Sequence, residues 1–307
     1  MLYSSEMHTD AGLYRQLLRI RRFEETVSEQ FSKGVFFGTT HSCIGQEANA
    51  VGVIANIDKD DIVVSNHRSH GHFIAYGGDV RSLFAELMGR STGIVAGRGG
   101  SQHLYWKNFY SNGIQGGITP IATGMALAEK YKENNSIVLV FIGDGTLGEG
   151  VLYESLNMAS LWSAPILFIL ENNQIAQTTP IQQAVAGDIG LRFKSFGIRV
   201  EDIDSSDVKT ILDAAHKQIT RVRLKRAPAA LIIHTCRFGP HSKGDDTRDI
   251  SEIVNMRSAR DPVMIQADRL ENDLKVSIEN EVNEEIQNAY NLALNDPFPN
   301  PEDVFAL

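Results

Sequence analysis

Two apolar runs that each end in polar residues constrain the fold of this chain more than any other feature. One run leads directly into Gly143-Asp144-Gly145, and the next leads into Asn172-Asn173. Each run has the length and composition of a buried parallel strand, and the residues between them suit a crossover helix. The carboxyl ends of parallel strands meet at one edge of a sheet, so we expect Asp144 and Asn173 to lie together there. Their oxygens suit a hard cation such as Mg2+, which would in turn hold a diphosphate.

The rest of the sequence continues this alternation of strands and helices. We predict helices over residues 10–32, 46–57, 80–89, 119–132, 149–161 and 206–222. We predict strands over residues 61–65, 136–142, 165–170, 197–203 and 229–235. The alternation predicts an α/β fold with a doubly wound, mostly parallel sheet and additional N- and C-terminal helices. The sequence contains no repeat or linker, so we expect residues 1–307 to form a single domain.

Two further segments have a distinctive composition. The glycine-rich segment 93–119 suits an active-site loop better than a regular element. The C-terminal segment has apolar residues at helical spacing with acidic residues between them, so we expect a helix packed on the outside of the sheet. These apolar residues are Leu274, Ile278, Val282, Ile286, Ala289 and Ala293.

Composition and charge argue against several classes of protein. The chain has 307 residues, of which 42% are hydrophobic, and its net charge of -9 predicts no bulk attraction to nucleic acid or anionic membranes. Its two cysteines, Cys43 and Cys236, lie outside any metal-ligand spacing and fit a reducing cytosol. Residues 1–6 lack the pattern of a signal peptide, and no apolar run is long enough for a membrane helix. We therefore expect a soluble, acidic, cytoplasmic protein.

The glycine turn after the first run admits a second interpretation. Residues 143–148 satisfy G-x-G-x-x-G between a strand and a helix, which is the pattern of a dinucleotide site, and Glu171 could meet a ribose. Two details weigh against a dinucleotide. The Asp144 carboxylate would repel the pyrophosphate unless a cation intervened, and a dinucleotide site has no use for Asn172-Asn173. A metal-bridged diphosphate explains both details, and an NAD-dependent oxidoreductase is the alternative from another class.

Gly-Asp-Gly followed at this spacing by Asn-Asn is the signature of thiamine diphosphate enzymes. The chain resembles the alpha subunit of the decarboxylating component of 2-oxo acid dehydrogenase complexes, which act on pyruvate, branched-chain 2-oxo acids or acetoin. The residues around His67 resemble most the acetoin-type bacterial members. The further motifs that carry the resemblance are Gly45-Gln46-Glu47, residues 65–71, Gly99-Gly100-Ser101-Gln102-His103, residues 153–159, Arg237 and His241-Ser242.

The resemblance implies the residues that bind the cofactor. Mg2+ would be bound by the side chains of Asp144 and Asn173 and by the backbone carbonyl of Ile175. His67 and Arg68 would grip the diphosphate oxygens, because a guanidinium presents a fixed fork of donors. The other cofactor-binding residues that the family implies are Gly113, Gln115, Gly143, Gly145, Thr146 and His241.

The resemblance also implies catalytic residues. Arg237 and His241 fall in the loop that lines the active-site channel of this family, where His241 would stabilise the bound 2-oxo acid. His70 is a third candidate, although a histidine in a loop is often only a solvated or hydrogen-bonded side chain. Gln115 departs from the family, which usually carries an apolar residue at this position, and a buried amide needs a partner. The departure weakens any prediction of the substrate.

Half of a thiamine diphosphate site is missing from the sequence. The chemistry requires a carboxylate that activates the aminopyrimidine, and in this family that glutamate belongs to a second, pyrimidine-binding domain. No second set of strands is predicted after residue 250. The resemblance therefore implies a beta subunit that carries this domain, in a heterotetramer of two alpha and two beta subunits.

The expected function is thus that of an alpha subunit of a thiamine diphosphate- and Mg2+-dependent 2-oxo acid or acetoin dehydrogenase. It would pass an acyl unit to a lipoyl-bearing acyltransferase or another carrier. One alternative is transfer of a two-carbon acyl unit to a carrier protein in specialised metabolism. A non-catalytic subunit that binds a diphosphate is a further alternative.

Overall fold

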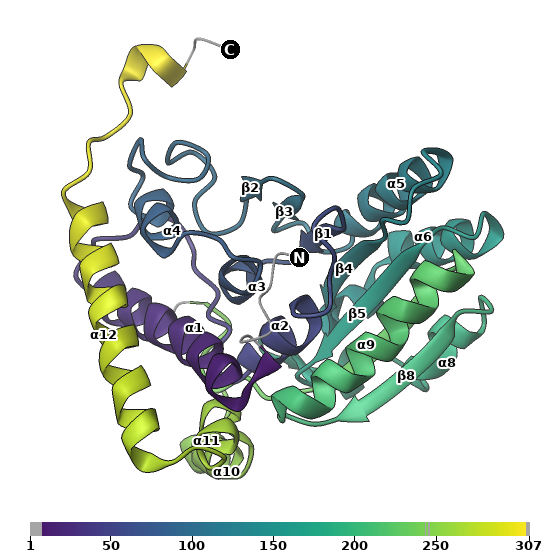
Figure 1. Cartoon of the computed structure of the whole chain (residues 1–307). Helices are drawn as coiled ribbons and strands as arrows, with labels where there is room; N and C mark the ends of the chain where they lie inside the picture. Colours follow the sequence, from purple (N-terminus) through teal and green to yellow (C-terminus); the bar gives the residue numbers. More distant parts are fainter. Residues whose placement is uncertain (1–7, 243, 245, 305–307) are drawn as a thin grey trace.

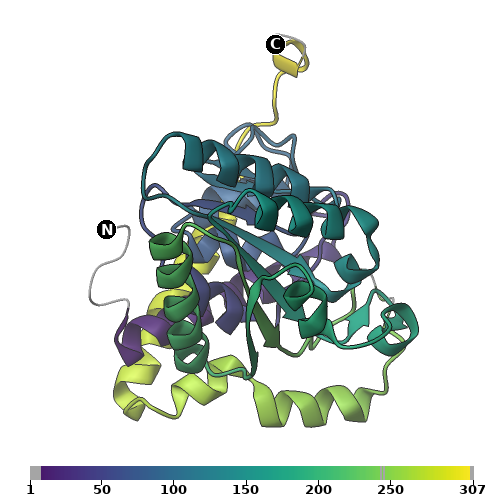
Figure 2. The same cartoon turned by 90° about the vertical axis from the view of Figure 1, so that its right-hand side faces the viewer.

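The computed structural model describes residues 8–304 except 243 and 245, so the predicted lack of a signal peptide in residues 1–6 lies outside the described residues. A seven-stranded sheet forms the centre of the fold (Figure 1, Figure 2). Every neighbouring pair of strands is parallel except β2 with β3, which confirms the predicted mostly parallel sheet. The strands, in spatial order, are β2 (Tyr105–Trp106), β3 (Phe109–Ser111), β1 (Ile62–Ser65), β4 (Val138–Gly143), β5 (Ile166–Asn172), β9 (Ala229–His234) and β8 (Arg199–Asp204).

Helices cover both faces of the sheet because strand side chains alternate between two apolar cores. On β4, Phe141 lies in one core and Val140 and Ile142 lie in the other, and all three are fully buried. This arrangement confirms the doubly wound α/β fold. The covering helices are α5 (Ile118–Tyr131) and α6 (Gly150–Leu161) on one face, and α2 (Glu47–Ile54) and α9 (Val208–Lys225) on the other (Figure 1).

The N-terminal and C-terminal helices pack against each other beside the sheet. α1 (Asp10–Phe31) begins after Thr9, whose side chain accepts a hydrogen bond from the backbone amide of Gly12 at 3.1 Å. α12 (Asn272–Leu294) contacts α1 and α4 (Val80–Leu87) (Figure 1). The prediction that this helix packs on the outside of the sheet is therefore wrong. Its apolar stripe is buried against helices, because α2 and α9 already cover the nearby face of the sheet.

Regular elements occur in two places where none was predicted. α3 (Ser69–Ala75) begins after His67 and Arg68 and contains His70. β2 and β3 lie within the glycine-rich segment 93–119, and β3 pairs in parallel with β1. Strands of two or three residues carry too little periodicity to be recognised, and their place at the sheet edge depends on pairing with β1.

The remaining part of the glycine-rich segment is a loop that one buried carboxylate organises. Glu86 of α4 accepts hydrogen bonds from the amides of Val95, Gly97, Gly99 and Gly100, with distances between 2.7 and 3.1 Å. Charge-assisted bonds of this kind can hold a loop that lacks a regular ladder.

After β9, the regular elements of the described residues are all helices, in agreement with the predicted absence of a second set of strands. None of the helices in the described part of the chain combines the length and the apolar composition needed to cross a membrane. The elements not yet named are β6 (Ile175–Ala176), β7 (Thr179–Pro180), α7 (Ile181–Ala184), α8 (Ile189–Lys194), α10 (Ile250–Arg260), α11 (Pro262–Ala267) and the short 3₁₀ helices η2 (Asp144–Gly148) and η3 (Pro301–Val304).

Candidate active site

A cavity of about 280 Å³ lies at the carboxyl ends of β1, β4 and β5. The chain runs from β1 to β3 on one side and then returns to form β4 on the other, so the cavity lies where the strand order reverses. The predicted site residues that line it are His67, Arg68, Gln115, Gly143, Asp144, Gly145, Thr146, Asn173, Ile175 and His241. The other lining residues are Gln46, Asn66, Glu149, Glu171, Ala176 and Gln177.

The turn after β4 places a buried carboxylate at the cavity. The 3₁₀ helix η2 follows β4 and contains the glycines of this turn from Gly145 on, and α6 begins only at Gly150. Asp144 Oδ1 accepts a hydrogen bond from the amide of Gly145 at 2.9 Å. Asp144 Oδ2 and Thr146 Oγ1 are buried and have no hydrogen-bond partner among the described residues. Because buried polar atoms are normally paired, both atoms are expected to meet a ligand.

The turn after β5 brings Asn173 and Ile175 to the same cavity. Gln174, between them, has a φ of 65°, which is in the left-handed region. Asn173 Oδ1 accepts a hydrogen bond from the amide of Ile175 at 3.2 Å, and Asn173 Nδ2 donates to Gln46 Oε1 at 3.4 Å. An amide oxygen has two lone pairs, so Asn173 Oδ1 can accept or coordinate one further group.

Glu171 of β5 holds the loop that follows β1. Its carboxylate accepts a hydrogen bond from Asn66 Nδ2 at 2.7 Å and lies 3.5 Å from His72 Nε2. Asn66 Oδ1 in turn accepts a hydrogen bond from the backbone amide of Arg68 at 2.8 Å. Burial acts to raise the pKa of Glu171, but His72 and the amide donors outweigh it and hold the pKa below its usual value. The ionised Glu171 therefore fixes the segment that carries His67 and Arg68.

Three imidazole rings meet at the edge of the cavity. The ring centroid of His41 lies 4.7 Å from that of His67 and 4.7 Å from that of His241. The centroids of His67 and His241 are 5.3 Å apart. Arg68 Nη2 donates to His241 Nδ1 at 3.2 Å. Burial lowers the pKa of His67 well below its usual value, and the neighbouring Arg68 charge acts in the same direction. His67 is therefore neutral at pH 7 and can donate a hydrogen bond without adding charge.

His41 is a site residue that the sequence did not predict. Its ring contacts His67 and His241, and Gln102 Nε2 lies 3.2 Å from its Nδ1. The only indication in the sequence is its place shortly before the Gly45-Gln46-Glu47 motif. Its approach to the other two histidines is a long-range contact that no local pattern reveals.

The structure does not bring the predicted catalytic residue His70 to the cavity. The side chain is fully buried in α3, where its Nε2 lies 2.7 Å from Ser101 Oγ and its Nδ1 lies 3.3 Å from a Glu24 carboxylate oxygen. Both ring nitrogens are thus engaged within the core. Its surroundings are those of a hydrogen-bonded core histidine, which was the alternative interpretation of this residue.

Two further predicted residues lie beside the cavity and do not line it. Arg237 is 1% exposed, and its Nη2 donates to the backbone carbonyl of Gln177, a residue of the cavity wall, at 3.2 Å. A Cβ atom at Gly113 would lie 2.0 Å from Gln102 Oε1. Glycine at this position therefore permits close packing against the loop that also contacts His41.

Burial raises the pKa of the Asp144 carboxyl above its usual value, and the Gly145 amide together with the charge of Arg237 only partly opposes this shift. Ionised Asp144 therefore destabilises the ligand-free protein at neutral pH, by about 1.4 kcal/mol for each pH unit between its folded and unfolded pKa values. Since the folded pKa is the higher one, this cost is fully present above it and disappears as the pH falls toward the unfolded value.

We therefore expect Asp144→Asn to raise the melting temperature of the ligand-free protein at pH 7. The gain should shrink as the pH is lowered through the raised pKa, because wild-type Asp144 then becomes protonated. Calorimetric melting of both proteins over a series of pH values measures this difference. An Asn variant that melts below the wild type at pH 7 would contradict the expectation.

Known proteins match almost the whole chain. A model of the Dehydrogenase E1 component family matches residues 15–302. The alpha subunit of the pyruvate dehydrogenase E1 component of Rhizobium meliloti is 36% identical over 309 residues, covering 96% of this chain and 88% of the relative. The corresponding subunit of Zymomonas mobilis is 36% identical, with 99% and 89% covered. The testis-specific mitochondrial form of Homo sapiens is 37% identical, with 95% and 77% covered.

These matches agree with the fold and with the place of the two sequence motifs. Gly143-Asp144-Gly145 and Asn173 come from neighbouring strands and line one cavity at the carboxyl edge of a parallel sheet. The chain therefore belongs to the dehydrogenase E1 component family, as an alpha subunit of a thiamine diphosphate-dependent 2-oxo acid dehydrogenase.

Proposed function

We propose that the cavity binds the diphosphate of thiamine diphosphate through Mg2+, with the side chains of Asp144 and Asn173 and the carbonyl of Ile175 as protein ligands. The observation that carries the proposal is Asp144 Oδ2, a buried atom at the cavity without a hydrogen-bond partner among the described residues. Over the same residues, no three His, Cys, Asp or Glu side chains form a metal-binding group. One carboxylate and two neutral oxygens still suit Mg2+, which completes its shell with phosphate oxygens and water.

The neighbouring residues suit the diphosphate itself. We assign Arg68 and His67 to the diphosphate oxygens, because one carries a fixed fork of donors and the other a neutral ring with a donor N–H. Thr146 Oγ1 is free to donate a third hydrogen bond. A Cβ atom at Gly145 would lie 3.1 Å from the Cβ of Ala176, so glycine keeps this wall of the cavity open.

When bound, thiamine diphosphate supplies the electron sink that allows the bond beside a 2-oxo carbonyl to break. The part of this chain is to hold the cofactor and to bind the substrate. His241 lines the cavity and is fixed by Arg68, so it can hydrogen-bond to the 2-oxo acid. Arg237 adds a buried positive charge behind the wall, which favours an anionic substrate. Since the relatives are pyruvate dehydrogenase subunits, we propose pyruvate or a similar 2-oxo acid as the substrate.

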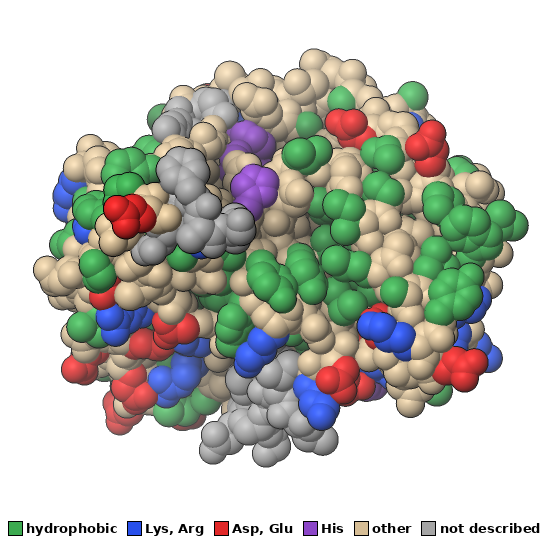
Figure 3. Space-filling view, turned by 90° about the horizontal axis from the view of Figure 1, so that it is seen from above, with side chains coloured by type: hydrophobic (Ala, Val, Ile, Leu, Met, Phe, Trp, Pro, Cys, Tyr) green, Lys and Arg blue, Asp and Glu red, His purple; other side chains and the backbone are tan. Residues whose placement is uncertain are grey.

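Alpha subunits of this family act with a beta subunit. We propose that the beta subunit supplies the carboxylate for the aminopyrimidine, as the resemblance to this family implies; of the two glutamates that line the cavity, Glu171 is already held by Asn66 and His72. Hydrophobic side chains gather over α5 and α6 on the face seen in Figure 3, as suits a subunit interface. Their exposed members include Ile121, Tyr131, Leu161 and Trp162.

We propose a single-domain subunit, residues 1–307, in a cytoplasmic heterotetramer of two alpha and two beta subunits. This complex would deliver its acyl unit to a lipoyl-bearing acyltransferase.

The dinucleotide interpretation has less support. A pyrophosphate site of that type needs a helix that begins at the glycines, whereas α6 begins at Gly150. The ribose would need the carboxylate of Glu171, which already accepts hydrogen bonds from Asn49 and Asn66.

The experiment that tests the proposal is assembly with the beta subunit, followed by measurement of CO2 released from pyruvate. We expect release to require both thiamine diphosphate and Mg2+ and to stop when EDTA removes the metal. Calorimetric binding of NAD without metal would instead favour the oxidoreductase. Cofactor binding without turnover would favour a non-catalytic subunit. Faster acyl transfer to a carrier protein than to a lipoyl domain would favour the alternative function, acyl transfer to a carrier protein in specialised metabolism.

A further inference from the structure

The amide of Asn172 joins the end of the sheet to the turn that follows β5. Asn172 is 2% exposed, and its Oδ1 accepts a hydrogen bond from the backbone amide of Gln174 at 3.1 Å. Its Nδ2 lies 2.9 Å from His234 Nδ1, and its backbone carbonyl accepts a hydrogen bond from the amide of Thr235 at 3.0 Å. The parallel register of β5 with β9 places Asn172 and His234 side by side.

Asn172, His234 and Asp202 form a chain of side-chain hydrogen bonds, which we call the relay. The contacts of Asn172 fix the orientation of each group in it. Because Asn172 Oδ1 accepts from a backbone N–H, its Nδ2 must be the donor toward His234 Nδ1. His234 therefore carries its proton on Nε2, which lies 2.9 Å from Asp202 Oδ1 of β8. The His234 side chain is 27% exposed and that of Asp202 is 48% exposed, so the relay runs from solvent to the buried amide.

The turn held by this relay has a conformation that needs support. Gln174 adopts a left-handed φ of 65°, which is unfavourable for a residue with a side chain. The bond from its amide to Asn172 Oδ1 is the contact that ties this residue to the end of β5. If the Asn172 amide rotated, the turn would lose that contact. The remaining hydrogen bonds, from Asn173 Nδ2 to Gln46 and from the Ile181 amide to the Gln174 carbonyl, would then hold the oxygens of Asn173 and Ile175 less firmly.

We infer that His234, oriented by Asp202, is a positioning residue for the metal-binding turn. It acts through Asn172, and neither His234 nor Asp202 lines the cavity. The inference rests on the proposed function, because it takes Asn173 and Ile175 as the Mg2+ ligands. Residues that orient metal ligands typically change metal affinity by about 10–100-fold when they are replaced.

The test uses the complex with the beta subunit, titrated with Mg2+ by calorimetry in the presence of excess thiamine diphosphate. His234→Phe keeps a planar ring of similar size and removes the acceptor, and we expect the Mg2+ dissociation constant to rise about 10-fold. Asp202→Ala should raise it less. Asp202→Asn should restore it, because the Asn amide oxygen can still accept a hydrogen bond from the Nε2–H of His234. The turnover number at saturating Mg2+ should change little, so the defect should appear in the Mg2+ requirement.

Arg260→Met is the matched structural control. Arg260 Nη2 donates to the backbone carbonyl of His234 at 2.9 Å and pairs with Asp204, so its loss disturbs the same strand end and leaves the side-chain contacts of the relay in place. We expect a lower melting temperature and an unchanged Mg2+ dissociation constant. An equal loss of Mg2+ affinity in Arg260→Met and His234→Phe would overturn the inference in favour of a merely structural role.

The remaining outcomes separate the two proposals. Wild-type Mg2+ binding by an Asp144→Ala complex would overturn the proposed function. Loss of binding in Asp144→Ala with wild-type titration of His234→Phe would overturn the relay alone. If His234→Phe does not assemble, the comparison of Asp202→Ala with Asp202→Asn decides, and equal constants in those two variants would reject the relay.

Discussion

Asp144→Ala is expected to abolish Mg2+-dependent binding of thiamine diphosphate and, with it, decarboxylation by the assembled complex. Asp144 supplies the single carboxylate among the proposed protein ligands, and its Oδ2 is buried at the cavity without a partner in the described part of the chain. We expect Mg2+ affinity to fall by more than about 100-fold, beyond the range typical of residues that only orient a ligand. Calorimetric titration with Mg2+ and the cofactor measures this loss, and CO2 release from pyruvate measures the loss of activity.

Asp213→Ala is a suitable control for this variant, because Asp213 is an exposed aspartate of α9 away from the cavity. Its complex should bind Mg2+ and the cofactor like the wild type. The melting temperature of the ligand-free Asp144→Ala protein provides a second check, since a value no lower than that of the wild type shows that lost binding does not come from lost structure. Undiminished turnover of the Asp144→Ala complex would refute the assignment of the cavity.

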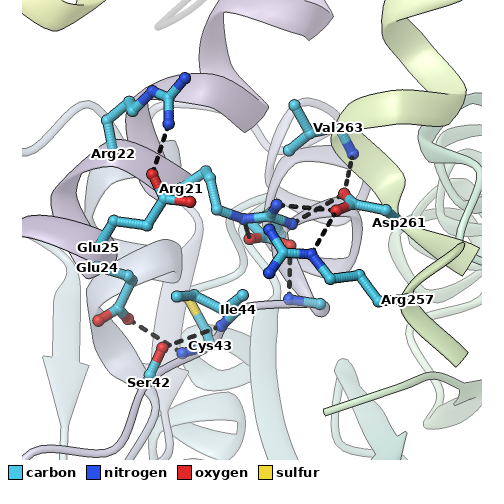
Figure 4. Close-up of polar contacts among 12 residues, drawn as sticks. Arg21, Arg22, Glu24, Glu25, Ser42, Cys43, Ile44, Arg257, Asp261 and Val263 are labelled. Atoms are coloured by element: carbon cyan, nitrogen blue, oxygen red, sulfur yellow. Dashed lines mark hydrogen bonds and ion pairs between the residues drawn. The ribbon is translucent and has the colours of Figure 1, made fainter. Parts of the chain in front are cut away.

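The second large effect is expected from Arg21→Met, which should lower the free energy of unfolding by about 3–5 kcal/mol. Arg21 of α1 donates from Nε to Glu47 Oε1 at 2.5 Å and from both terminal nitrogens to Asp261 at 2.9 Å. The three side chains are at most 5% exposed. Figure 4 shows Arg21 facing Asp261, which Arg257 also contacts. Without Arg21, Glu47 loses its positive partner in a buried site, and Asp261 keeps its hydrogen bond from the Val263 amide and the contact with Arg257.

Urea unfolding of the chain measures the effect of Arg21→Met. The matched control is Arg22→Met, because Arg22 forms a half-exposed pair with Glu25 and should contribute no more than about 1 kcal/mol. Adding Glu47→Gln and Asp261→Asn to Arg21→Met should recover part of the loss, since the unpaired charges are then removed. Equal effects of the Arg21 and Arg22 variants would show that the buried network is not a major source of stability.

The parts of the fold that the sequence predicted are those set by local patterns. The apolar run of β4 and the helix of α1 follow from the periodicity of apolar residues within one segment. Asp144 and Asn173 were predictable as neighbours because the carboxyl ends of adjacent parallel strands must meet. The motif therefore indicated the cavity before any contact was known.

The parts that the sequence did not predict depend on contacts between distant segments. The apolar stripe of α12 shows that one face is buried, but it does not reveal that α1 and α4 bury it. His70 lies only three residues from His67, yet the turn into α3 directs one into the core and leaves the other at the cavity. His41 and the Asn172 relay likewise arise only when loops and strands from separate regions converge.

The buried carboxylate of Asp144 also links the lifetime of the subunit to vitamin supply. If it binds the incoming cation, as proposed, a group that destabilises the empty protein would make the loaded form the more durable one. Free ligand at 100 times its dissociation constant adds about 2.7 kcal/mol to folding stability. Degradation follows the population of opened molecules when opening is rapid. Subunits made during thiamine shortage would therefore be removed faster than those made in its presence, without a dedicated regulator.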